Sequence, residues 1–184
     1  MKGESTPGRP ADEELVARAK KGHLQAMDEL VRRHHASVYR VSLGILRDED
    51  AAADSSQDAF LKAFKGLKGF RGDASFRTWL LTIAANEARG VLRKRARRGE
   101  QDLEAAGPVV SDDPGPEEGL VLKEDAQRIR ELLSGLPEKQ RLAVALRIFE
   151  GLSFREVGKL IGSSEGAARV NYHHGIRRLR EMFK

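Results

Sequence analysis

The sequence predicts an all-α protein made of two small helical domains joined by an acidic flexible linker. Apolar residues recur at helical spacing through most of the chain, and no alternating run of the kind typical of β-strands rises above noise. Residues 99–119 contain seven acids, three prolines and no Lys or Arg, so this segment marks the domain boundary. A chain of 184 residues with 40% hydrophobic and 5% aromatic residues builds only modest cores, which favours two small modules.

The charge of the chain indicates a polyanionic partner. The formal net charge is +5 and the isoelectric point is about 9.6, with acidic and basic residues segregated along the chain. Because there is no cysteine, nothing argues for disulfides or a thiolate zinc site, and a reducing cytoplasm is the expected compartment. The N-terminus lacks the apolar core of a signal peptide, and no run approaches the ~20 apolar residues of a membrane span. We therefore expect a soluble, cytoplasmic protein with no direct membrane insertion.

The first domain is expected over residues 12–98, after a disordered lead over residues 1–11 that is rich in Gly, Pro and polar residues. Either Ser75 or Asp73 is suited to cap the last helix of this domain. Apolar spacing and capping signals predict helices over residues 12–22, 23–46, 51–64 and from 76 onward. Along the last of them, six residues share one face: Phe76, Trp79, Leu80, Ile83, Ala84 and Glu87.

The second domain is expected over residues 120–184 and has the form of a helix-turn-helix. A helix over residues 120–133 is followed by a mostly buried helix in which Pro137 takes a favoured first-turn position. Two further helices are predicted over residues 153–161 and 165–183, with a short turn between them.

The last of these helices presents residues that are free to enter a major groove or to meet phosphates. They are Ser164, Glu165, Ala167, Arg169, Asn171, His173 and Arg177. Short-turn hairpins are common, so the same pattern also fits an ordinary helical hairpin with a solvated basic face. The basic C-terminus favours DNA binding.

The stretch from Phe70 to Arg98 combines an aromatic loop with a basic helix end. Phe76 and Trp79 lie on the apolar face and are expected in the core, whereas Phe70 and Arg71 lie in the loop and remain free to contact DNA. Six cations within ten residues exceed what a solubilising helix end needs, although such an end remains the alternative. They are Arg89, Arg93, Lys94, Arg95, Arg97 and Arg98. Each phosphate neutralised by such a cation adds about 0.9 to the salt dependence of duplex binding.

An acidic face on the third predicted helix favours protein docking over catalysis. Asp54 and Asp58 lie four residues apart with Gln57 beside them on one helix face. No His or third carboxylate is placed to complete a metal or acid–base site, and adjacent histidines diverge by about 100° on a helix. We therefore expect no enzyme activity, no metal and no cofactor.

Two segments resemble a known family. Residues 48–95, which include DSSQDAF and FRGDASFRTWLLTIAANEARG, resemble conserved region 2 of bacterial sigma-70-family sigma factors. Residues 136–181, which begin LPEKQRLAVALRIFEGLSFREVGKLIG, resemble region 4 of the same family. With only these two regions and a short acidic linker between them, the chain is similar to the extracytoplasmic-function group. The resemblance implies an α-helical region 2 bundle and a region 4 helix-turn-helix.

The resemblance also implies a role for each surface. The clamp helices of the β′ subunit of core RNA polymerase would be met by Asp54, Gln57, Asp58 and Phe60. The minus-ten element of promoter DNA would be recognised and melted through Phe70, Arg71, Ser75, Arg77, Asn86, Arg89 and Arg93. The second helix of the C-terminal pair would read the minus-thirty-five element, and the helix pair around it would meet the β flap. An anti-sigma factor that clamps one or both modules is also expected.

Three adjacent pairs depart from the family pattern: Ser55-Ser56, Ala167-Ala168 and His174-Gly175. The first pair stands where aliphatic residues are usual, the second replaces Thr and Val, and the third replaces a more basic, helix-favouring pair. The promoter sequence therefore does not transfer from the family to this chain.

Two other functions compete with this interpretation. One is a conventional helix-turn-helix regulator whose N-terminal module senses a signal or dimerises, but such a regulator has no need of the acidic docking face. The other is a helical nucleic-acid-processing enzyme, which the missing metal or nucleophile constellation disfavours.

Overall fold

The computed structural model describes residues 10–99 and 132–182, and all regular structure in these two ranges is helical. This confirms the predicted fold class. The elements are α1 (Asp12–Lys20), α2 (Leu24–Leu46), α3 (Glu49–Gly66), a single 3₁₀ turn η1 (Leu67–Gly69), α4 (Phe76–Arg97), α6 (Glu138–Ile148), α7 (Phe154–Ile161) and α8 (Glu165–Met182). Most of the predicted lead, most of the linker and most of the helix predicted over residues 120–133 lie outside the described residues.

Side-chain caps fix where several helices begin. The carboxylate of Asp48 accepts a hydrogen bond from the backbone N–H of Ala51 at the start of α3, at 2.9 Å. The hydroxyl of Ser75 does the same for Thr78 at the start of α4, so Ser75 rather than Asp73 caps this helix. Each cap satisfies a backbone donor that has no partner within its own helix.

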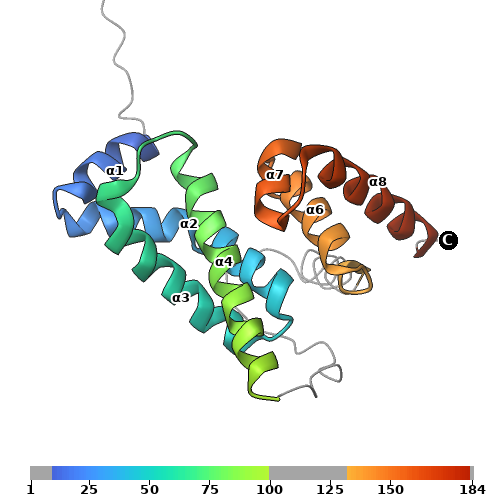
Figure 1. Ribbon diagram of the computed structural model, residues 1–184. Coiled ribbons are helices and arrows are strands. Elements are labelled where there is room, and N and C mark those ends of the chain that lie inside the picture. Colours follow the sequence, from blue (N-terminus) through green and yellow to red (C-terminus); the bar gives the residue numbers. More distant parts are fainter. Residues whose placement is uncertain (1–9, 100–131, 183–184) are drawn as a thin grey trace, which may run out of the picture.

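The N-terminal module is a bundle in which α2, α3 and α4 pack side by side and α1 covers one end (Figure 1). Its centre is filled by aliphatic side chains with essentially no exposure, among them Leu30, Val38, Leu80 and Leu81. The face of α4 in contact with other elements is wider than the predicted stripe, because α4 contacts α2, α3 and α7. Four residues outside that stripe are therefore also buried: Thr78, Leu81, Ala85 and Ala88.

In the C-terminal module, α7 and α8 form the predicted helix-turn-helix and both pack on α6. Gly162 ends α7 in the left-handed conformation, with φ of 63°. A Cβ atom at Gly175 of α8 would lie 2.7 Å from Cγ2 of Val144 and 3.2 Å from the carbonyl oxygen of Gln140. The glycine that departs from the family pattern thus permits the close crossing of α8 and α6. Pro137 precedes α6 rather than lying in its first turn.

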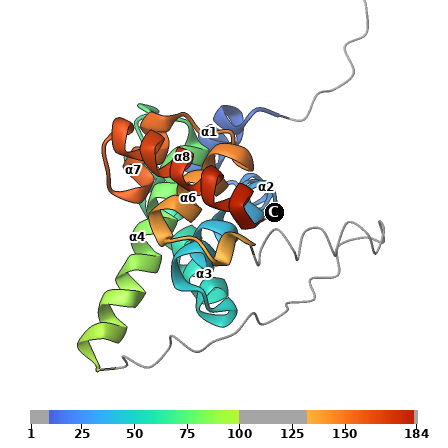
Figure 2. The same cartoon turned by 90° about the vertical axis from the view of Figure 1, so that its right-hand side faces the viewer.

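The two modules pack against each other. Helix α2 contacts α6, and α4 contacts α7, so the buried apolar cluster continues from one module into the other. Figure 2 shows the C-terminal module in front of the bundle, with the last turns of α4 projecting beyond this contact.

Among the described helices, none is long and apolar enough to cross a membrane.

Candidate functional site

The acidic side chains of α3 lie on its exposed face. Asp54, Gln57 and Asp58 are all exposed, while the family-atypical Ser55 and Ser56 face the bundle and are buried. The hydroxyl of Ser56 donates to the carbonyl of Ala52 at 2.6 Å, so the helix itself satisfies this buried polar group. The serine pair therefore occupies the aliphatic positions of the family without changing which side of α3 faces solvent.

Phe60 does not share this exposed face. Its side chain is 6% exposed and belongs to the core, with its ring centroid 6.2 Å from that of Phe64. The neighbouring Leu61 is 58% exposed instead. Leu61 follows Gln57 by four residues and Asp54 by seven, so helical periodicity would have placed it on the acidic face. Phe60 therefore lies beneath the exposed face rather than on it with the acids, and Leu61 is the apolar residue on the exposed side.

The loop before α4 is pinned by its aromatic residue. The ring of Phe70 is half-buried, with centroid distances of 4.9 Å to Trp79 and 6.0 Å to Phe76. The amine of Lys20 in α1 donates to the carbonyl of Phe70 at 2.7 Å and lies 5.6 Å from the ring centroid. Phe70 is thus an anchor of the loop rather than the free aromatic side chain that the sequence suggested. Arg71 beside it is exposed.

A groove of about 240 Å³ lies between α3 and α4. Asp58 from the acidic face lines it together with Asn86 and Arg93 from α4. The buried hydroxyl of Ser55 also lines the groove and has no hydrogen-bond partner within residues 10–99 and 132–182. The structure thus brings predicted polymerase-docking and DNA-contacting residues to one depression.

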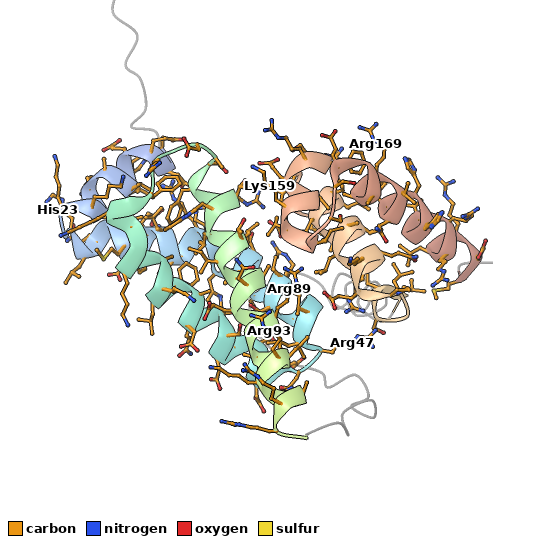
Figure 3. All side chains as sticks on the ribbon, in the orientation of Figure 1. His23, Arg47, Arg89, Arg93, Lys159 and Arg169 are labelled. Atoms are coloured by element: carbon orange, nitrogen blue, oxygen red, sulfur yellow. The ribbon has the colours of Figure 1, made fainter. Side chains whose placement is uncertain are left out.

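Arg77 and Arg89 of α4 are engaged by the C-terminal module. The guanidinium of Arg77 donates to the backbone carbonyl of Glu150 at 2.8 Å and also pairs with the Glu150 carboxylate. The guanidinium of Arg89 donates to the carbonyl of Leu160 in α7, at 2.7 Å. Figure 3 shows Arg89 on the side of α4 that faces this module, with Arg93 further along the helix.

Glu150 is the one acid among these contacts, and it is 5% exposed. It accepts a hydrogen bond from Ser37 at 2.7 Å and two from Arg40 of α2, at 2.8 and 2.6 Å. Burial raises the pKa of this carboxyl, but the hydrogen bonds from Ser37 and Arg40 and the charges of Arg40 and Arg77 outweigh burial, so the pKa lies below its ordinary value. Glu150 is therefore ionised at neutral pH and bridges α2, α4 and the C-terminal module.

The predicted DNA-contacting residues of α8 are exposed except at two positions. Ser164, Glu165, Arg169, His173 and Arg177 are exposed, whereas Ala167 and Asn171 are half-buried. Several of them also have roles within the helix, because Ser164 accepts from the N–H of Ala167 and Asn171 donates to the carbonyl of Ala167, at 3.1 and 2.8 Å. Figure 3 shows Arg169 on the outward side of α8.

Phe154 was not singled out in the sequence but fixes the position of α8. Its ring is in contact with the guanidinium groups of Arg147 and Arg169, at 4.6 and 4.9 Å from the ring centroid, and meets Tyr172 of α8 edge-on. Such stacking orients Arg169 on the exposed face. An aromatic residue directly after Ser153, at the start of the helix predicted over residues 153–161, was the only sequence signal for this role.

Across the part of the chain that the structure describes, no group of three or more His, Asp or Glu side chains lies close enough to hold a metal ion. The surfaces present charge, hydrogen-bond donors and the groove between α3 and α4, and these features suit binding to a polyanion and to a protein partner.

Comparison with known families and proteins gives consistent matches. The sigma-70 region 2 family model matches residues 30–98, and a sigma-70 region 4 model matches residues 126–179. The RNA polymerase sigma-H factor of Pseudomonas aeruginosa is 32% identical over 166 residues, which cover 86% of each chain. The ECF RNA polymerase sigma-E factor of Escherichia coli has the same identity and coverage.

Two solved structures share the fold. One is CnrH in complex with the cytosolic domain of CnrY, with a TM-score of 0.66 and 25% identity, covering 95% of this chain and 97% of CnrH. The other is the sigma factor RpoE in complex with the anti-sigma factor NepR from Bartonella quintana. It has a TM-score of 0.70 and 23% identity, covers 85% of this chain and 95% of RpoE, and shows likeness of fold alone.

Proposed function

Because this chain belongs to the extracytoplasmic-function group of sigma-70-family sigma factors, we propose that it binds core RNA polymerase, directs it to a promoter and promotes strand opening. The observation that carries the proposal is the presence of two separate exposed surfaces on one body. One is the acidic face of α3 and the other is the outward face of α8. The protein acts by binding alone and performs no covalent step, and it acts in the cytoplasm, where core polymerase and DNA are found.

Core polymerase docks on the exposed face of α3. Asp54, Gln57 and Asp58 supply charge and hydrogen-bonding groups, and the exposed Leu61 supplies apolar area among them. An interface of this composition suits basic and polar side chains on the clamp helices of β′, because charge complementarity steers encounter and excludes wrong partners. Phe60 supports the face from within the core.

The minus-ten element is contacted by the loop before α4 and by the exposed side of α4. Arg71, Asn86 and Arg93 are exposed and available for phosphates and bases, while Ser75 fixes the start of the helix. Phe70 holds the loop on the bundle through Trp79. Arg89 lies one helical turn before Arg93, and Arg77 lies at the start of α4 next to the loop, on the opposite side of the helix from Asn86; both are assigned to the same DNA element.

The minus-thirty-five element is read by α8 in the major groove. Exposed residues at its N-terminal end are suited to base edges, and Arg169 and Arg177 to phosphates. The C-terminal module also meets the β flap of the polymerase. We assign polymerase and minus-ten binding to a domain over residues 12–98 and minus-thirty-five binding to a domain over residues 120–184, with residues 99–119 as the linker.

An anti-sigma factor completes the set of partners. CnrH and RpoE were each solved with a protein partner bound, the cytosolic domain of CnrY and the anti-sigma factor NepR. By analogy, a protein that covers the face of α3, the face of α8 or both would keep this chain from polymerase.

The test is reconstitution with purified core RNA polymerase. The full chain should be retained by immobilised core and should direct run-off transcription from a subset of genomic promoter fragments. A chain that neither binds core nor supports initiation, in the absence of any inhibitor, excludes the sigma-factor function. Duplex binding without core binding would instead favour the helix-turn-helix regulator.

A further inference from the structure

A single buried carboxylate joins the two modules. Glu150 lies between α6 and α7 and receives Ser37 and Arg40 from α2 and Arg77 from α4. A buried charge is tolerated only where it is paired and hydrogen-bonded, and these three partners all come from the other module. Ser37, Arg40 and Arg77 therefore surround this carboxylate only when the two modules are in contact.

A second contact supports the same closed arrangement. Arg141 of α6, 7% exposed, donates to the carbonyl of Gly44 in α2 through Nε and Nη2, at 3.1 and 2.6 Å. A Cβ atom at Gly44 would lie 2.9 Å from Cδ2 of Leu142, so a larger residue at this position requires the end of the Leu142 side chain to move. The void left beside this contact, between Val41 and Leu142, is only about 20 Å³. The surfaces of α2 and α6 are therefore complementary in shape where the two modules meet.

The closed arrangement occupies α4 at positions assigned to DNA. Arg77 is held by Glu150, and Arg89 by the carbonyl of Leu160. The hydroxyl of Thr78 also donates to Glu156 of α7 at 2.8 Å, which brings the C-terminal module over the start of α4. A guanidinium bound to a protein carboxylate or carbonyl is not available to a phosphate in the same geometry.

We propose that Glu150 is an intramolecular latch that holds the free protein closed and withholds Arg77 and Arg89 from promoter DNA until the modules separate. The proposal rests on the minus-ten role assigned to α4 above. The carboxylate occupies the place that a DNA phosphate takes in the open state, since both are oxyanions that Arg77 can bind. Opening also frees Arg40 of α2 from Glu150, so one release leaves both guanidinium partners of this carboxylate unpaired.

The latch is tested by the distance between the modules in the full-length chain. Because the chain has no cysteine, Gln25→Cys in α2 and Glu181→Cys in α8 give two exposed labelling sites for energy transfer. Glu150→Gln keeps the shape of the side chain but removes its charge. We expect it to shift the ratio of closed to open molecules by roughly tenfold, because hydrogen bonds to charged groups are the strong ones. The mean label distance should therefore increase.

A second variant opens the modules without altering any group that binds the carboxylate. Gly44→Gln places a side chain against Leu142, and glutamine favours a helix more than glycine does. This variant should lengthen the label distance as Glu150→Gln does. The matched control is Glu13→Gln, an exposed acid of α1, which should leave the distance unchanged. Circular dichroism at the labelling temperature confirms that each variant is folded.

The DNA readout separates the latch from the proposed function. Both opening variants should bind a single-stranded minus-ten oligonucleotide several-fold more tightly than the parent, while Glu13→Gln should not. An unchanged label distance in both folded variants overturns the latch, whatever transcription shows. A longer distance without tighter oligonucleotide binding overturns the withholding of Arg77 and Arg89. Loss of core binding and initiation in the parent itself, with the distance response intact, counts against the sigma-factor function alone.

Discussion

Helices α4 and α8 both carry predicted DNA-contacting residues, yet their surroundings differ. Helix α4 packs against α2, α3 and α7, and two of its arginines are bonded to the other module. Helix α8 packs mainly on α6 and α7 and points charged side chains outward, as Arg169 does in Figure 3. DNA contact by a helix that is covered on several sides can be regulated by the elements that cover it. DNA contact by an outward-facing helix depends mainly on the side chains of that helix.

The largest expected effect concerns the exposed acidic face of α3, which neither α4's contacts with the C-terminal module nor α8 covers. Asp54→Lys combined with Asp58→Lys should weaken core binding by at least about 100-fold, because like charges across an interface cost several kcal/mol. Fluorescence anisotropy with labelled protein and core polymerase measures the affinity. Asp28→Lys, an exposed acid of α2, is the control and should change it little. If duplex binding by α8 falls equally, the double variant is misfolded, and if core affinity is unchanged, α3 is not the docking face.

Gly175→Ala tests whether the outward helix depends on its close crossing with α6. The added Cβ would lie 2.7 Å from Val144, so we expect a loss of about 1–3 kcal/mol in the free energy of unfolding, as for overpacked cores. Urea unfolding followed by circular dichroism measures it. Gly166→Ala in the same helix has no atom closer than 4.0 Å and should be neutral or stabilising. Equal stability of the two variants would show that the crossing is not tight.

Arg177→Ala tests whether α8 contacts duplex DNA more directly than α4 does. Arg177 is exposed on α8, and removing one phosphate contact should lower the salt slope of duplex binding by about 0.9. Titrations of a minus-thirty-five duplex at several salt concentrations give the slope. Arg89→Ala on α4 should leave this slope unchanged because its guanidinium is bonded to Leu160. If Arg89→Ala lowered the salt slope and Arg177→Ala did not, α4 rather than α8 would be the helix that contacts this duplex.

Asp48→Ala gives the smallest expected effect and has a pH signature. Loss of the cap of α3 should cost about 1 kcal/mol at neutral pH. The hydrogen bond from the N–H of Ala51, and then the contact with Arg95, hold the pKa of Asp48 below its ordinary 3.8 despite some burial. A depressed native pKa means that the stabilisation is present above pH 3.8 and is lost as pH falls through the lower native value.

Urea unfolding of parent and Asp48→Ala across that pH range checks this dependence. The difference between the two should shrink in acid. Asp50→Ala in the first turn of the same helix should cost only a few tenths of a kcal/mol, through the helix dipole. A difference that stays constant with pH would show that the Asp48 carboxylate is not the stabilising group.

Local signals in the sequence were sufficient for the helices, for the choice of Ser75 or Asp73 as the cap of α4 and for the exposed acids of α3. Helical spacing put Asp54 and Asp58 on one side of a helix, and this side is exposed although it also carries the apolar Leu61. The same rule, applied to Phe60, would have separated it from the acids: it lies two residues beyond Asp58, on the other side of the helix. Its burial at 6% follows from that geometry.

Contacts between residues far apart in the chain were not predictable in the same way. The carboxylate of Glu150 meets Ser37 and Arg77, which lie 113 and 73 positions away, and no periodicity links them. Phe70 was placed in a loop correctly, but its anchoring by Lys20 depends on how α1 covers the bundle. The departure of Gly175 from the helix-favouring residue of the family was visible in the sequence, whereas its reason, the proximity of Val144, appears only once α6 and α8 are packed.

The last turns of α4 project past the contact between the modules (Figure 2), and Arg93, Lys94, Arg97 and Arg98 there are exposed. Charge of this kind acts at long range and raises the rate of diffusional encounter with DNA. Since the closed arrangement leaves this end uncovered, the chain can be captured by any DNA before its modules separate. We therefore expect the association rate to fall steeply with ionic strength, while the later rate of strand opening is set by the separation of the modules and depends little on salt.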